Sequence, residues 1–210
     1  IDLAPTVLEL AGIPEPAFRA GLARRPHLIG ADMGSVDPGP YYLGAGKLAT
    51  ARSSSKRDLS LAVIGAVRNG IPLIIGTAGT GGGDPHLAET VEIIREIARE
   101  NGLNFRLATI NAEMPRDVIK AAVRAGKTVP IGPIEPLTEA TVDGAARIVG
   151  QMGMEAFQRA IDLEPDIIIA GRLFDDHARP IGLHLVRQHG GQAGADALPH
   201  LAAVGNDVDR

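Results

Sequence analysis

Four short apolar runs, each followed by a loop rich in glycine and polar residues, constrain the fold of this chain most. These loops begin at Gly30, Ala78, Asn111 and Gly171. Between the runs, apolar residues recur at helical spacing, and these segments end near Gly70, Gly102 and Gly126, where left-handed helix C-caps are expected. The sequence therefore predicts strands that alternate with helices.

The apolar runs are nearly continuous, as in Leu73–Ile75 and Ile167–Ile169, which is typical of a parallel sheet covered on both faces. Right-handed crossovers then predict an α/β fold, a three-layer Rossmann-like sandwich with a mostly parallel sheet. The expected organisation is a helical lead-in at 1–25, an α/β domain at 26–190 and an irregular, truncated tail at 191–210. Within the domain, prolines at 130–136 indicate an internal linker, and Thr138 is expected to begin a long helical segment that reaches about Leu163.

Composition excludes several classes of function. The net charge of -4 and the absence of a basic stripe with interleaved aromatic residues argue against nucleic-acid binding. No apolar run is long enough to cross a bilayer and the first residues do not resemble a signal peptide, so a cytoplasmic protein is expected. With no cysteine, any metal would need His, Asp or Glu ligands.

The loop at 76–86 is the richest in glycine, and its backbone N–H groups are expected to approach an anion at the N-terminus of the following helix. It departs from the dinucleotide-binding fingerprint because Asp84 stands where the third glycine belongs, which disfavours NAD. The expected ligand is a phosphate or carboxylate, held by Gly79, Thr80, Gly81, Gly82 and Gly83. The alternative is structural: Asp84 as helix N-cap, with Pro85 at the first helical position.

Gly44–Lys47 resembles a P-loop only superficially, because Tyr41 replaces its first glycine and Leu48 follows the lysine. ATP hydrolysis is therefore disfavoured. Lys47 could neutralise an anionic group of a ligand, or be a solvated loop lysine.

Charged residues follow three of the apolar runs. Asp32, Ser35 and Asp37 come first, and the two carboxylates could act as general base or hold Mg²⁺ or Mn²⁺. The alternative is that they stabilise a turn. Glu113 follows the third run and Arg172 follows the fourth, where a guanidinium could clamp a carboxylate by a bidentate contact.

Several collinear segments between about Pro26 and Arg172 resemble the acyclic terpene utilisation AtuA family. The segments are Gly30–Gly46, Lys56–Leu59, Ile74–Gly79, Ala112–Glu113, Ile148–Gly153 and Ala170–Arg172. Family members are longer, so the resemblance covers their first half. It implies a role in the bacterial breakdown of acyclic terpenes or related carboxylic acids through CoA thioesters.

These observations predict a lyase- or hydratase-like enzyme, or an enzyme component, that acts on a small organic acid or acyl-CoA. Asp32 and Asp37 would act as base or cation ligands, Glu113 as the partner acid, and Ser35 would contact the substrate. CoA would enter as part of the substrate. The alternative is a noncatalytic subunit that binds a nucleotide or CoA, and a homo-oligomer or a partner subunit is expected in either case.

Overall fold

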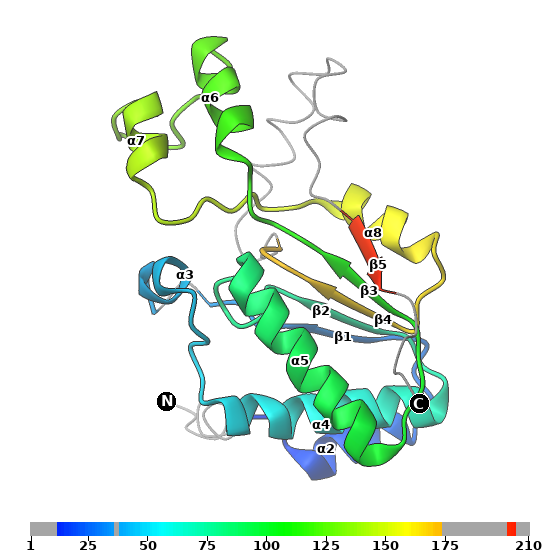
Figure 1. Cartoon of the computed structure of the whole chain (residues 1–210). Coiled ribbons are helices and arrows are strands. Elements are labelled where there is room, and N and C mark those ends of the chain that lie inside the picture. Colours follow the sequence, from blue (N-terminus) through cyan, green and yellow to red (C-terminus); the bar gives the residue numbers. More distant parts are fainter. Residues whose placement is uncertain (1–11, 36–37, 174–200, 205–210) are drawn as a thin grey trace.

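The chain forms a five-stranded sheet, seen in the computed structural model of Figure 1, which describes residues 12–35, 38–173 and 201–204. The strand order is β1-β2-β4-β3-β5. The first four strands in this order are parallel, and β5 pairs antiparallel with β3. Their bounds are β1 (Ile29–Asp32), β2 (Leu73–Gly76), β4 (Ile167–Ala170), β3 (Leu107–Ile110) and β5 (Leu201–Val204).

Helices cover the sheet on both faces. Side chains of β2 and β4 such as Leu73 and Ile169 pack in one core cluster with α4 (Arg52–Asn69) and α5 (Asp84–Asn101). Ile168, its neighbour in β4, packs on the other face with α8 (Met154–Ile161). Because successive strand residues point to opposite faces, these two clusters confirm the predicted three-layer Rossmann-like sandwich.

The predicted glycine caps are confirmed. Gly70 after α4 and Gly102 after α5 have φ values of 62° and 60°, and Gly126 follows α6 (Arg116–Arg124) with a φ of 64°. The start of α5 differs by one residue from the structural alternative considered above. Gly83 is its N-cap, so Asp84 takes the first helical position and Pro85 the second.

The long helix expected from Thr138 to about Leu163 is wrong. The chain instead forms α7 (Glu139–Gly144) and α8, separated by residues 145–153. This connection runs beside the segment after β3, where Met114 N donates to Ile148 O and Gly150 N donates to Ala112 O, at 2.9 and 2.8 Å. Backbone pairing across the chain therefore competes with helix formation, and glycines at 144, 150 and 153 favour the break.

The tail at 191–210, expected to be irregular, contains β5. Its four residues pair with β3 in the register Leu107↔Val204 to Ile110↔Leu201. A run of four small apolar residues carries no clear periodicity, so only its pairing with β3 identifies it as a strand.

The remaining helices lie around this core. The first, α2 (Glu15–Leu22), packs on α4, where a Cβ on Gly65 would lie 2.7 Å from the Phe18 ring. Figure 1 shows α3 (Tyr41–Ala45), α6 and α7 at the carboxyl-terminal end of the parallel strands. Within the described ranges, no helix combines the length and apolar character required to span a membrane.

Candidate functional site

The loops after β2, β3 and β4 meet at the carboxyl-terminal edge of the sheet. Since β4 lies between β2 and β3, its continuation contacts both neighbours. Thr77 N donates to Gly171 O at 2.9 Å, and Gly171 N donates to Ile110 O at 2.8 Å. The connection after β2 leads through α5 on one face of the sheet, and the connection after β3 leads to α8 on the other. Open α/β sheets commonly bind ligands at the carboxyl-terminal edge where such connections diverge.

The glycine-rich loop is buried and packs tightly against its own chain. A Cβ on Gly82 would lie 2.4 Å from Arg172 N, and one on Gly81 would lie 2.6 Å from His86 Nε2. Two of its amides are already used, since Thr80 N donates to Thr77 O and Gly82 N to Ala78 O. Close packing therefore explains why glycine is needed here, whereas anion binding by Gly79 to Gly83 stays a prediction.

Glu113 lies at the N-terminus of α5. Its Oε1 accepts hydrogen bonds from Asp84 N at 3.1 Å and from Arg147 Nη1 at 2.6 Å. Asn111 Nδ2 in turn donates to Asp84 Oδ1 at 2.9 Å. The partial positive charge of an 18-residue helix favours a carboxylate at this position. The side chains of Glu113 and Arg147 are 25% and 27% exposed, so a ligand can reach this ion pair from solvent.

Arg172 lies next to the glycine loop and is half-buried. Its backbone N donates to Gly82 O at 3.1 Å, while its Nη1 makes one long contact of 3.4 Å to Thr80 O. Among the described residues no carboxylate pairs with its guanidinium. A half-buried arginine without an acidic partner is suited to bind the carboxylate of a ligand.

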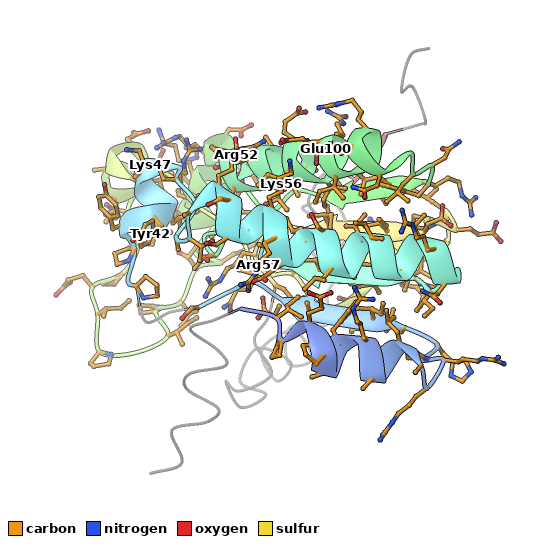
Figure 2. All side chains as sticks on the ribbon, turned by 90° about the horizontal axis from the view of Figure 1, so that it is seen from below. Tyr42, Lys47, Arg52, Lys56, Arg57 and Glu100 are labelled. Atoms are coloured by element: carbon orange, nitrogen blue, oxygen red, sulfur yellow. The ribbon has the colours of Figure 1, made fainter. Side chains whose placement is uncertain are left out.

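The segment that carries Lys47 lies over the start of α5. A Cβ on Gly46 would lie 3.1 Å from Arg147 Nη2 and 3.4 Å from Pro85 Cγ. Lys47 N donates to Tyr42 O at 3.2 Å, and Figure 2 shows both residues at the α3 end of the helical layer. The Lys47 side chain is exposed and forms no ion pair within the described ranges.

Asp32 does not join Glu113. It ends β1 opposite Gly76, and β1 lies three strand positions from β3, or roughly 14 Å along the sheet. Asp32 Oδ1 accepts a hydrogen bond from Gly34 N at 2.8 Å, which is the turn-forming role considered as an alternative. Ser35 is half-buried beside this turn, and Asp37 lies outside the described residues. In the part of the chain that is described, no three His, Asp or Glu side chains form a metal-binding group.

Two residues at this edge were not among the predicted site residues. Arg147 fell inside the expected long helix, and His86 was only the last residue of the glycine-rich loop at 76–86, with no role of its own. Gly144, Gly150 and Gly153 are the signal that could have indicated an irregular segment around Arg147. Comparison with known proteins gives no match, whether to a protein-family model, to a curated protein or to a solved structure.

Proposed function

We propose that this protein is an enzyme, or a component of one, that acts on a small organic acid or its CoA ester by acid–base chemistry such as hydration or elimination. The observation that carries the proposal is the half-buried Arg172, which has no acidic partner among the described residues and whose backbone contacts Gly82, next to the Gly83 position that Glu113 Oε1 approaches. A cation and a carboxylate on neighbouring loops are suited to hold an acid substrate while a proton is transferred.

Each residue at this edge has a role in the proposal. Arg172 binds the substrate carboxylate by a bidentate contact, and Glu113 takes up or delivers the proton. Arg147 holds Glu113 in place through its 2.6 Å contact. Lys47 neutralises a second anionic group, such as a phosphate of CoA. Asp32 lies farther along the edge, and we propose it as a second base or, together with Asp37, as a ligand of Mg²⁺ or Mn²⁺.

The resemblance to the AtuA family supports a catabolic, cytoplasmic role in acyclic terpene or related carboxylic-acid degradation. The resembling segments include Ala112–Glu113 and Ala170–Arg172, which carry the two residues at the centre of the proposed site. A homo-oligomer or a partner subunit is proposed as well. Its support is the segment between α6 and α7, where Val129, Ile131 and Ile134 are 71%, 82% and 68% exposed.

The test is binding of small carboxylates, acyl-CoAs and free CoA, measured by calorimetry and thermal shift, with Mg²⁺ and Mn²⁺ assayed separately. A ligand that prefers the native state raises the melting temperature. Arg172→Gln should abolish carboxylate binding, and Arg172→Lys should weaken it because an ammonium cannot make the bidentate contact. The control is Arg106→Gln, whose side chain is 56% exposed and lies at the amino-terminal end of β3.

Binding that is lost in the Arg172 variants and kept in the Arg106 variant would support the proposal. Carboxylate binding that is unchanged in Arg172→Gln would contradict it. Tight binding of CoA or a nucleotide without turnover, and without help from Glu113, would favour the noncatalytic subunit instead.

A further inference from the structure

His86 is a fully buried histidine inside the glycine loop. It is the third residue of α5, and 0% of its surface is exposed. A Cβ on Gly79 would lie 3.0 Å from His86 Cβ, and one on Gly81 would lie 2.6 Å from His86 Nε2. The loop therefore encloses the imidazole, and any larger residue at Gly81 would collide with the ring.

The contacts of the ring indicate its tautomer. His86 Nε2 lies 3.0 Å from Tyr42 O, and a carbonyl oxygen can only accept a hydrogen bond. Nε2 therefore carries the proton, and in the neutral ring Nδ1 presents a lone pair. This Nδ1 is buried and has no hydrogen-bond partner among the described residues. A buried acceptor without a hydrogen-bond partner lowers the stability of the folded state. We therefore expect a donor to bind to Nδ1.

His86 Nδ1 and the Glu113 carboxylate both lie close to Gly83. The point that a Cβ on Gly83 would occupy lies 3.3 Å from His86 Nδ1 and 2.9 Å from Glu113 Oε1. Gly83 is the N-cap of α5, and the preceding Gly82 packs against the backbone of Arg172. His86 Nδ1 and the partly exposed Glu113 carboxylate are therefore neighbours at Gly83, and the backbone of Arg172, which has no acidic partner in the described chain, lies beside the adjoining Gly82.

We propose that His86 Nδ1 accepts a hydrogen bond from a hydroxyl group of the ligand, and that the substrate class is a hydroxy acid. The inference rests on the proposed function and deepens it. The ligand carboxylate binds Arg172, and its hydroxyl lies beside Gly83 between His86 Nδ1 and Glu113. The Glu113 side chain is 25% exposed, so the ligand would reach this point from its side. His86 would then select hydroxy acids over acids that lack the hydroxyl.

The experiment compares matched ligands on the full chain by calorimetry: malate with succinate, and 3-hydroxybutyrate with butyrate. The wild type should bind each hydroxy acid about tenfold more tightly, the value of one net hydrogen bond. His86→Gln places an amide near the Nε2 position, where it can still donate to Tyr42 O, but it lacks the Nδ1 acceptor. It should keep carboxylate binding and its melting temperature, and lose the preference for the hydroxyl.

His86→Asn is the reciprocal variant, because it keeps a polar atom near the Nδ1 position and loses the contact with Tyr42 O. It should retain part of the hydroxyl preference at a lower melting temperature. If both variants unfold, ¹⁵N NMR of the wild-type imidazole replaces them. The Nδ1 resonance should then shift with malate and stay unchanged with succinate.

Equal binding of the matched ligands, or a preference that survives in His86→Gln, would overturn the inference. Carboxylate binding that still depends on Arg172 would leave the proposed function standing in that case. If no carboxylate binds at all, both the inference and the proposed function are wrong.

Discussion

The glycines of the loop after β2 are compatible with two structural roles, anion binding and close packing. In the sequence, Gly79 to Gly83 indicated a backbone that approaches an anion. In the structure, the places where side chains would be are filled by His86, Arg172 and Glu113 of the same chain. The glycine content of a loop therefore predicts that another group approaches its backbone closely, but it does not show whether that group belongs to a ligand or to the same chain.

Gly82→Ala should lower the free energy of unfolding by about 1–3 kcal/mol, because an L-residue is strained in the left-handed region. Gly82 has a φ of 68°, and its Cβ would meet Arg172 N at 2.4 Å. Urea unfolding measures the change. Gly132→Ala is the matched control, since nothing lies within 4 Å of its Cβ position, and it should be nearly neutral. Similar losses in the two variants would contradict the packing role of Gly82.

Glu113→Gln tests the carboxylate at the start of α5. The amide keeps the shape of the side chain but loses the charge that pairs with Arg147 and with the helix N-terminus. We expect a lower melting temperature and no turnover of any substrate found. Glu92→Gln is the control, because Glu92 forms an exposed ion pair with Arg95 that contributes about 0.5 kcal/mol or less. Full turnover in Glu113→Gln would exclude a proton-transfer role.

Among the elements, those with buried faces were predictable and those defined by pairing were not. Strands β2 and β4 and the ends of α4 and α5 follow from continuous apolar runs and glycine caps, whereas β1, which is mostly exposed, was indicated by the polar loop that follows it. The break between α7 and α8 depends on backbone bonds to residues 112–114, far away in sequence. Arg147 belongs to that segment, so sequence periodicity alone placed it in a helix. Predicting the position of Arg147 therefore required knowledge that the segment between α7 and α8 pairs with the segment after β3.

Arg116 of α6 joins α6 to the end of α7. Its Nη1 donates to Val142 O at 2.5 Å and its Nη2 to Ala145 O at 2.6 Å, and it makes longer contacts with the carbonyls of residues 143 and 146. These carbonyls lie at or just after the end of α7, where a cation is favourable. Because Arg147 follows directly, Arg116 also positions the partner of Glu113.

Arg116→Met should therefore accelerate hydrogen exchange at residues 142–150 and reduce ligand affinity without unfolding the sheet. Hydrogen exchange followed by mass spectrometry measures the first effect, since local opening governs exchange there. Arg124→Met, which removes an exposed ion pair with Glu139, is the control. Equal protection of 142–150 in both variants would exclude this positioning role.

An ion-pair network joins α4 to α5 on the outside of the helical layer. Arg52 contacts Glu89 and Glu96, and Lys56 contacts Glu96 and Glu100. Figure 2 shows Arg52 and Lys56 on α4 beside Glu100 on α5. Hydrogen bonds from Lys56 and then Arg52 hold the pKa of Glu96 below its usual value of 4.5. A bond to Glu100 and then one to Glu96 raise the pKa of Lys56 above 10.5.

The directions of the two pKa shifts, of Glu96 and of Lys56, determine how the stability of the fold depends on pH. A carboxyl with a lowered folded-state pKa stabilises the fold above pH 4.5, and this contribution is lost as pH falls through the folded pKa. Lys56 contributes below pH 10.5 and loses its contribution as pH rises through its raised pKa. Glu96→Gln should thus be less stable than the wild type at pH 7 and should approach it near pH 3. Urea unfolding at both pH values is the measurement, and a constant difference would contradict the role of Glu96.

At the scale of the whole molecule, several large apolar side chains are exposed in the segment between α6 and α7. Ile131 and Ile134 lie between α6 and α7, in a segment with prolines at 130, 133 and 136. Figure 1 shows that α6 and α7 extend beyond the sheet. At the opposite edge, a cavity of about 480 Å³ is lined by apolar residues such as Ile71, Phe105 and Ile161. Such surfaces are where a second copy or a partner subunit would bind.

Replacing Ile131 and Ile134 together by serine should lower the oligomeric state if this segment forms the proposed interface. Sedimentation velocity over a range of protein concentrations measures it. Met154→Ser is the control, because Met154 is 74% exposed at the start of α8 and lies outside this segment. A wild type that sediments as a monomer at every concentration would contradict homo-oligomerisation through this surface.

The pairing of β5 with β3 has a consequence for synthesis on the ribosome. All four residues of β3 are buried, yet the strand beside it comes from Leu201–Val204, more than 90 positions later in the chain. Until those residues emerge, β3 presents an unpaired apolar edge, which is a template for association with other nascent chains. Translation speed and chaperone supply should therefore influence the yield of this protein more strongly than its folded stability would suggest.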